Sequence, residues 1–104
     1  MINIKELSWS NHARVEREDR MMAILMTVGF GEICYEKKCV DDETRIQYFT
    51  DTGCILIVSG DIIITGYIAS IDQALGFFSG KVPISIRKAV AHSNKMIKNY
   101  VARF

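Results

Sequence analysis

Two strongly apolar runs joined by a tight turn constrain this chain more than any other feature. Residues 54–58 read CILIV, residues 62–69 read IIITGYIA, and Gly60-Asp61 forms a two-residue turn between them. Runs rich in β-branched residues on both sides of such a turn predict a β-hairpin. Because the runs are nearly continuous rather than alternating, we expect both strands at the centre of a sheet that is covered on both faces.

The residues before this hairpin predict two more strands and a helix. Partial alternation of apolar and polar residues indicates strands over residues 31–39 and 44–50. Ser10 or Asn11 can cap a helix that runs to about Val28, and a glycine suited to a helix end follows it. The first half of this helix is polar, whereas its second half is apolar all round, which is typical of a buried segment.

The residues after the hairpin predict two helices. Ser70 or Asp72 can cap a short helix that ends at Phe78, and Pro83 suits the first turn of a long final helix. An apolar seam with spacings of three and four residues follows, interrupted by one small polar residue: Ile86, Val90, Ser93, Ile97, Tyr100 and Phe104. This spacing predicts packing on the sheet, and a homodimer through the C-terminal helix is the alternative.

These elements predict the fold class α+β for residues 1–104 as a single domain. The expected order is an N-terminal helix, an antiparallel sheet of about four strands, a short helix and a long C-terminal helix. Apolar residues make up 49% of the 104 residues and there is one proline, so the chain is expected to fold rather than stay disordered.

Composition also predicts where the protein resides. No apolar run approaches the roughly 20 residues of a membrane helix, and the charged N-terminal residues do not form a signal peptide. The odd number of cysteines is typical of reduced thiols. We therefore expect a cytoplasmic protein with no membrane partner.

Charge is unevenly distributed along the chain. Residues 1–72 hold 7 basic and 12 acidic side chains, whereas residues 73–104 hold 6 basic and none acidic. On the last helix, Lys88 and Lys95 flank His92 at helical spacing and form a candidate nucleic-acid-binding patch. A merely solvated basic helix face is the alternative interpretation.

A second candidate site combines the first helix with the hairpin. His12 can exchange protons near neutral pH, Arg20 can hold a phosphate, and Arg17 can add a contact to nucleic acid. Thr65 and Tyr67 lie two residues apart and therefore share one face of a strand. An ion pair of Glu16 with Arg20, and ordinary strand roles for the two hydroxyls, are the alternatives. No spacing of histidines or cysteines predicts a metal site, and we expect no cofactor.

The order of these features resembles small phage and toxin-like proteins of the barnase/EndoU/colicin/RelE-like ribonuclease superfamily. The resemblance spans roughly residues 8–75 and rests on the Asn11-His12-Ala13 start, Arg20, the Thr52-Gly53 turn, the apolar hairpin, Thr65 with an aromatic residue two positions on, and Ala69-Ser70 with Gln73-Ala74.

The resemblance implies a nucleolytic site between helix and sheet that works without metal. His12 would act as acid or base, Arg20 would clamp a phosphate, Thr65 would position it and Tyr67 would be a second donor. This chain has Glu16 where similar proteins often carry a basic residue, which is consistent with a member that does not cleave.

The sequence is compatible with two functions and does not decide whether the protein is an enzyme. One is a small phage or mobile-element accessory protein that binds a host protein or RNA without catalysis, for example as an anti-defence inhibitor. The other is a metal-independent ribonuclease or toxin that cleaves RNA through attack by the ribose 2′-hydroxyl.

Overall fold

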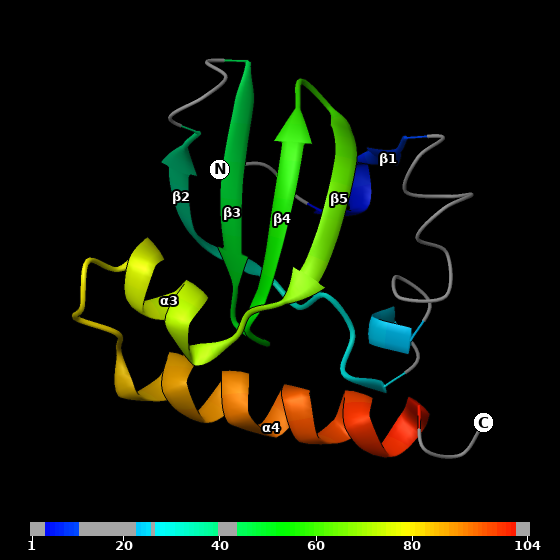
Figure 1. The fold of residues 1–104 in the computed structure, drawn as a ribbon. Helices are drawn as coiled ribbons and strands as arrows, with labels where there is room; N and C mark the ends of the chain where they lie inside the picture. The colour runs from blue at the N-terminus through cyan, green and yellow to red at the C-terminus, as the bar shows by residue number, and fades with distance from the viewer. Residues whose placement is uncertain (1–3, 11–22, 26, 40–43, 102–104) are drawn as a thin grey trace.

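A five-stranded sheet organises the structure, a computed structural model that describes residues 4–10, 23–25, 27–39 and 44–101 (Figure 1). The strands lie in the order β1-β5-β4-β3-β2. Along the chain the elements are a 3-10 helix η1 (Ile4–Glu6), β1 (Ser8–Trp9), β2 (Ile33–Lys38), β3 (Arg45–Thr50), β4 (Cys54–Ser59), β5 (Ile62–Ile68), α3 (Ile71–Phe77) and α4 (Ile84–Val101).

The predicted hairpin is present as β4 and β5. The two strands pair antiparallel from Cys54 opposite Ile68 to Ser59 opposite Ile62, and β4 is the central strand of the sheet. β3 pairs antiparallel with β4, and β2 pairs antiparallel with β3. The four strands expected from the sequence therefore form one continuous meander, with a register shift between Ile57 and Val58.

The prediction of about four antiparallel strands was incomplete. Ser8 and Trp9 form a fifth strand, β1, which pairs parallel with β5 opposite Ile62 and Ile63. The sheet is therefore mixed. The sequence did not predict this strand, because two residues are too few to show alternation and the partner strand is distant in sequence.

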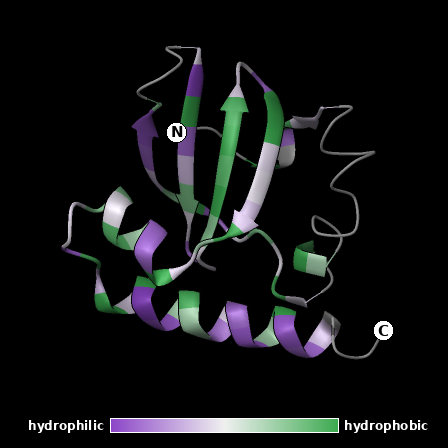
Figure 2. Cartoon of the chain, viewed as in Figure 1, coloured by the Kyte–Doolittle hydropathy of each residue, from purple (hydrophilic) through white to green (hydrophobic). Residues whose placement is uncertain are grey.

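Each face of the sheet carries its own apolar core, as the continuous apolar runs predicted. β4 is hydrophobic along almost its whole length (Figure 2). Its even-numbered residues Cys54, Leu56 and Val58 belong to one core, whereas Ile55 and Ile57 belong to the other. Five of the six residues of this strand therefore contribute to a core, at roughly 1.5–3 kcal/mol for each large apolar side chain.

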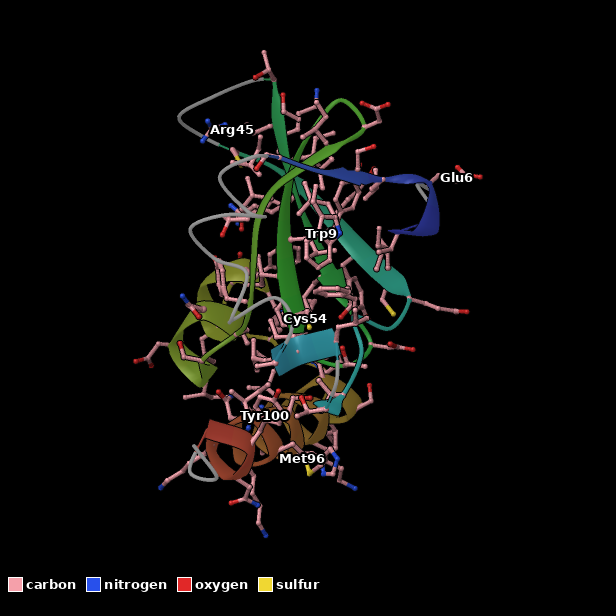
Figure 3. The ribbon with its side chains drawn as sticks, turned by 90° about the vertical axis from the view of Figure 1, so that its right-hand side faces the viewer. Glu6, Trp9, Arg45, Cys54, Met96 and Tyr100 are labelled. Carbon is pink, nitrogen blue, oxygen red and sulfur yellow. The ribbon has the colours of Figure 1, made fainter. Side chains whose placement is uncertain are left out.

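The N-terminal part of the chain covers the first face. Ile24, Phe30 and Tyr48 are buried there, and Trp9 packs at the edge with its ring 5.8 Å from that of Phe30. Figure 3 shows Trp9 lying over the strands and Cys54 beside the short helical segment near Ile24. The fold thus brings the N-terminal residues back onto the centre of the sheet.

The helices α3 and α4 cover the second face. Phe49 and Ile55 of the sheet pack against Ala74 of α3 and against Ile86 and Val90 of α4. The Phe49 ring lies 5.2 Å from the rings of both Phe77 and Phe78. α3 begins with the predicted cap, because Ser70 and Gln73 form a reciprocal capping box.

The predicted seam of α4 is confirmed where it is described. Ile86, Val90 and Ser93 are buried, and Ile97 and Tyr100 are half-buried. Ile97 packs against the core of the first face, whereas Val90 packs against the core of the second. α4 therefore crosses the end of the sheet and contacts both cores (Figure 1). Phe104 lies outside the described residues.

The predicted N-terminal helix is described only at its C-terminal end. Residues 23–25 and 27 are helical, and Gly29 follows with φ of +68°, as expected at a helix end. The expectation of an apolar segment buried all round was wrong at Leu25, which is 47% exposed although Ala23 and Ile24 are buried. The segment has only one sheet face to cover, so one of its sides remains on the surface.

The turn between β3 and β4 joins these layers. The Thr52 hydroxyl lies 3.1 Å from the carbonyl oxygen of Gly29 and 3.0 Å from that of Phe30. The Ser93 hydroxyl of α4 donates to the Thr52 carbonyl oxygen, which explains the polar break in the apolar seam. Gly53 has φ of +85°, and a Cβ atom there would lie 3.0 Å from Cα of Val90. The backbone of the helix therefore rests on this turn.

Replacement of Gly53 by alanine should destabilise the protein more than the same change at Gly60. Both residues have positive φ, so each substitution carries about 1–2 kcal/mol of backbone strain. Only Gly53→Ala also forces a methyl group against Val90, which adds about 1–3 kcal/mol, because nothing lies within 4 Å of a Cβ at Gly60. Urea unfolding measures both variants, and equal losses would show that α4 does not depend on this contact.

Candidate functional site

Thr65 and Tyr67 lie on the same face of β5, as their spacing predicted. Thr65 is opposite Ile57, and Tyr67 is opposite Ile55. Because Ile55 belongs to the core under α3 and α4, both hydroxyl-bearing residues face the side of the sheet that carries these helices. Both are half-buried.

The strand register extends this pair into a row across the sheet. Ile57 is opposite Gln47 of β3, and Gln47 is opposite Lys37 of β2. The row therefore contains Lys37, Gln47, Ile57 and Thr65. Arg45 and Gln47 are two residues apart on β3 and therefore lie on one strand face, which the register identifies as the face of Thr65. Lys37 was missed, because a register shift between Ile33 and Tyr35 disrupts the alternation of β2.

The sheet face that carries Thr65 and Tyr67 is covered by helices at one end and open at the other. On β3, Phe49 is buried, Gln47 is half-buried and Arg45 is exposed. α3 and α4 lie at the Phe49 end of the sheet, and Figure 3 shows Arg45 near the opposite end from Cys54. The open end thus presents polar and basic side chains beside the half-buried Thr65.

Tyr67 has a packing role in this arrangement. Its side chain packs against the core that contains Phe49 and Ala74, together with Phe77 and Phe78. Lys37 lies at the margin of the same cluster, with Nζ 5.9 Å from the centroid of the Phe77 ring. The Tyr67 ring therefore stabilises the core, whether or not its hydroxyl group contacts a ligand.

The other members of the predicted hairpin site cannot be placed beside this face. His12, Arg17 and Arg20 lie outside the described residues. Their convergence with Thr65 and Tyr67, and the ribonuclease roles assigned to all four candidate catalytic residues, stay predictions.

The outer side of α4 carries the candidate nucleic-acid-binding patch. Lys88 and Lys95 are both exposed, as are Arg87, His92 and Lys98. On a helical projection all five lie away from the seam formed by Ile86, Val90 and Ile97. Residues 84–101 contain no acidic side chain. We call this surface the basic side of α4; it comprises Arg87, Lys88, His92, Lys95 and Lys98.

The thiols of Cys34 and Cys54 are poor nucleophiles at neutral pH. Burial raises the pKa of Cys54, although hydrogen bonds from Thr52 and Thr50 partly oppose this effect. Desolvation raises the pKa of Cys34, and the nearby carboxylates of Asp51 and Glu32 raise it further. A raised thiol pKa lowers the thiolate fraction at a given pH, so this chemistry does not favour covalent catalysis by either residue.

Among the described residues, no group of three or more histidine, cysteine, aspartate or glutamate side chains is arranged to hold a metal ion. Within those residues there is also no helix with the length and apolar character needed to cross a membrane.

No protein-family model matches this chain, and comparisons with curated proteins and with solved structures find no match either. The resemblance to the ribonuclease superfamily therefore stays a prediction, and the candidate sites are judged from their own geometry.

The cysteines should differ sharply in reactivity. Iodoacetamide should modify exposed Cys34 in the folded protein and leave Cys54 unmodified until the protein unfolds, because Cys54 is both inaccessible and protonated. Modification at Cys34 should accelerate as the pH rises toward its raised pKa. Peptide mass spectrometry after native and denaturing labelling measures both sites. Native labelling of Cys54 at the rate of Cys34 would contradict the buried position.

Proposed function

We propose that this protein is a non-catalytic binding module that contacts host RNA through the basic side of α4. The observation that carries the proposal is that Arg87, Lys88, Lys95 and Lys98 are all exposed on a helix without acidic residues. Clustered cations on one helix side attract the phosphate backbone independently of base sequence.

The rigidity of α4 supports this role. Its seam is held by the hydrogen bond from Ser93 to Thr52 and by the contact of Val90 with Gly53. Asn94 also donates to the Ala69 carbonyl oxygen at 2.9 Å. The cations thus project from a fixed helix, so the backbone loses little conformational freedom on binding.

The spacing of the cations fits a run of phosphates. Arg87 and Lys98 are separated by about 16 Å along the helix axis, at about 1.5 Å per residue. Lys88 and Lys95 lie between them. A backbone that follows this side of the helix can meet up to four cations, whereas a compact phosphate ligand meets only one or two.

Charge reversal on α4 should weaken RNA binding without affecting folding. With four phosphate contacts, log K should fall with log salt with a slope of about −3. The double variant Lys88→Glu/Lys95→Glu should weaken binding at least about tenfold at low salt and make the slope less negative by about 2. Fluorescence anisotropy with a labelled RNA hairpin measures this, and thermal melting should be unchanged because both side chains are exposed.

Lys37→Glu provides the matched control, since it reverses one exposed charge on the sheet face instead of on α4. RNA binding that responds to Lys37→Glu but not to the α4 double variant would move the site to the sheet. A different result is that the protein fails to bind RNA but captures a host protein stoichiometrically, in a manner that depends on Lys88 and Lys95. That result would identify an acidic protein surface, rather than RNA, as the ligand of this helix.

We retain metal-independent RNA cleavage as a second candidate function. The observation in its favour is that Thr65 and Tyr67 share a face with Gln47 and Lys37, where polar groups lie beside an open end of the sheet. Incubation of the protein with RNA in the presence of a chelator should then yield fragments, and His12→Ala should abolish them. Intact RNA, or equal cleavage by wild type and His12→Ala, would remove this candidate.

A further inference from the structure

β2 forms one edge of the sheet, and its outer side is accessible. The strand lies beyond β3 at the end of the strand order, and five of its six residues are exposed. Figure 1 shows it at the opposite edge from β1. An exposed edge strand presents unpaired backbone groups that can accept another strand.

The register shows which backbone groups point outward. The Cys39 N–H donates to the Arg45 carbonyl oxygen, so the backbone N–H and C=O groups of Cys39 point toward β3. Hydrogen-bonded and non-hydrogen-bonded pairs alternate along an antiparallel ladder. The backbone groups of Lys37, which lies opposite Gln47, therefore also point toward β3. The backbone N–H and C=O groups of Glu36 and Lys38 therefore point to the free edge.

We propose that β2 pairs antiparallel with β2 of a second copy of this chain, with Lys37 at the two-fold axis. This register places Glu36 of each copy opposite Lys38 of the other. Both residues offer outward backbone groups, so the two pairs form four backbone hydrogen bonds. Each pair also sets a carboxylate beside an ammonium group on the same face of the joined sheet.

The central Lys37 pair is the one unfavourable feature of this register, and the structure reduces its effect. Lys37 lies on the opposite face of the strand from Glu36 and Lys38. Its Nζ is 5.9 Å from the Phe77 ring of its own chain, so each ammonium group is held toward its own α3. The two charges therefore turn away from the axis.

This dimer differs from one formed through the C-terminal helix. The apolar seam of α4 is buried against the chain's own turn and cores at Ile86, Val90 and Ser93. A dimer through that seam would have to expose these residues, whereas pairing through β2 uses backbone groups of Glu36 and Lys38 that point away from β3.

Charge exchange tests the register. Sedimentation over a range of protein concentrations should show wild type shifting from its monomer mass of 11.8 kDa to twice that mass. Glu36→Lys and Lys38→Glu should each weaken the dimer about tenfold, because both pairs become like-charged. A mixture of the two single variants should form a heterodimer, in which both pairs are again of opposite charge. Circular dichroism checks that each variant folds.

A monomer at every concentration of wild type would overturn the proposal. Single variants as dimeric as wild type, or a mixture that stays monomeric, would also overturn it. An independent arm uses disulfide formation in a Cys34→Ser/Cys39→Ser background. Lys37→Cys should crosslink under oxidation, because directly opposite residues that are not hydrogen-bonded to each other lie about 4.5 Å apart between Cα atoms. Lys38→Cys is the control, since it meets Glu36 rather than another cysteine.

Discussion

The contact between α4 and the turn at Thr52-Gly53 is the constraint on which the other layers of this protein depend. Thr52 holds the segment at Gly29 and Phe30 through its side chain, and holds Ser93 of α4 through its carbonyl oxygen. The Thr50 hydroxyl lies 3.1 Å from that of Thr52 and accepts from the Cys54 N–H. A single turn thus positions both the N-terminal segment that covers one face of the sheet and the helix α4. The hydroxyl groups of Thr50, Thr52 and Ser93 are each hydrogen-bonded where three segments meet, so these groups avoid the cost of an unsatisfied buried donor or acceptor.

The sequence predicted those parts of the fold that depend on local patterns. The four antiparallel strands, a helix cap at Ser70 or Asp72 and the α4 seam follow from alternation, capping residues and helical spacing, and the structure places the cap at Ser70. β1 did not, because two residues carry no periodicity and its partner β5 lies more than fifty positions away in the chain. The side of the sheet occupied by Thr65 was likewise undetermined, since it depends on where the helices pack. Lys37 was missed as its neighbour, because the irregular register of β2 hides the alternation.

Two surfaces of the protein are chemically distinct and lie on different elements. The basic side of α4 belongs to a helix without acidic residues and suits a polyanion. The edge of β2 offers outward backbone groups and the opposite charges of Glu36 and Lys38, which suit another strand. Because neither surface uses residues of the two cores, each can change without loss of the fold. This separation allows a chain of this size to hold a rigid scaffold and still present more than one contact surface.

The single tryptophan occupies a position that reports on only half of the structure. Trp9 packs beside Phe30 in the core of the first face, and the buried Tyr48 belongs to the same core. The aromatic cluster of Phe49, Phe77 and Phe78 on the other face contains no indole ring. Intrinsic fluorescence excited at the indole band therefore follows the docking of the N-terminal segment onto the sheet. Loosening of α3 alone would leave that signal nearly constant, so the two faces of the sheet are spectroscopically separable without any added label.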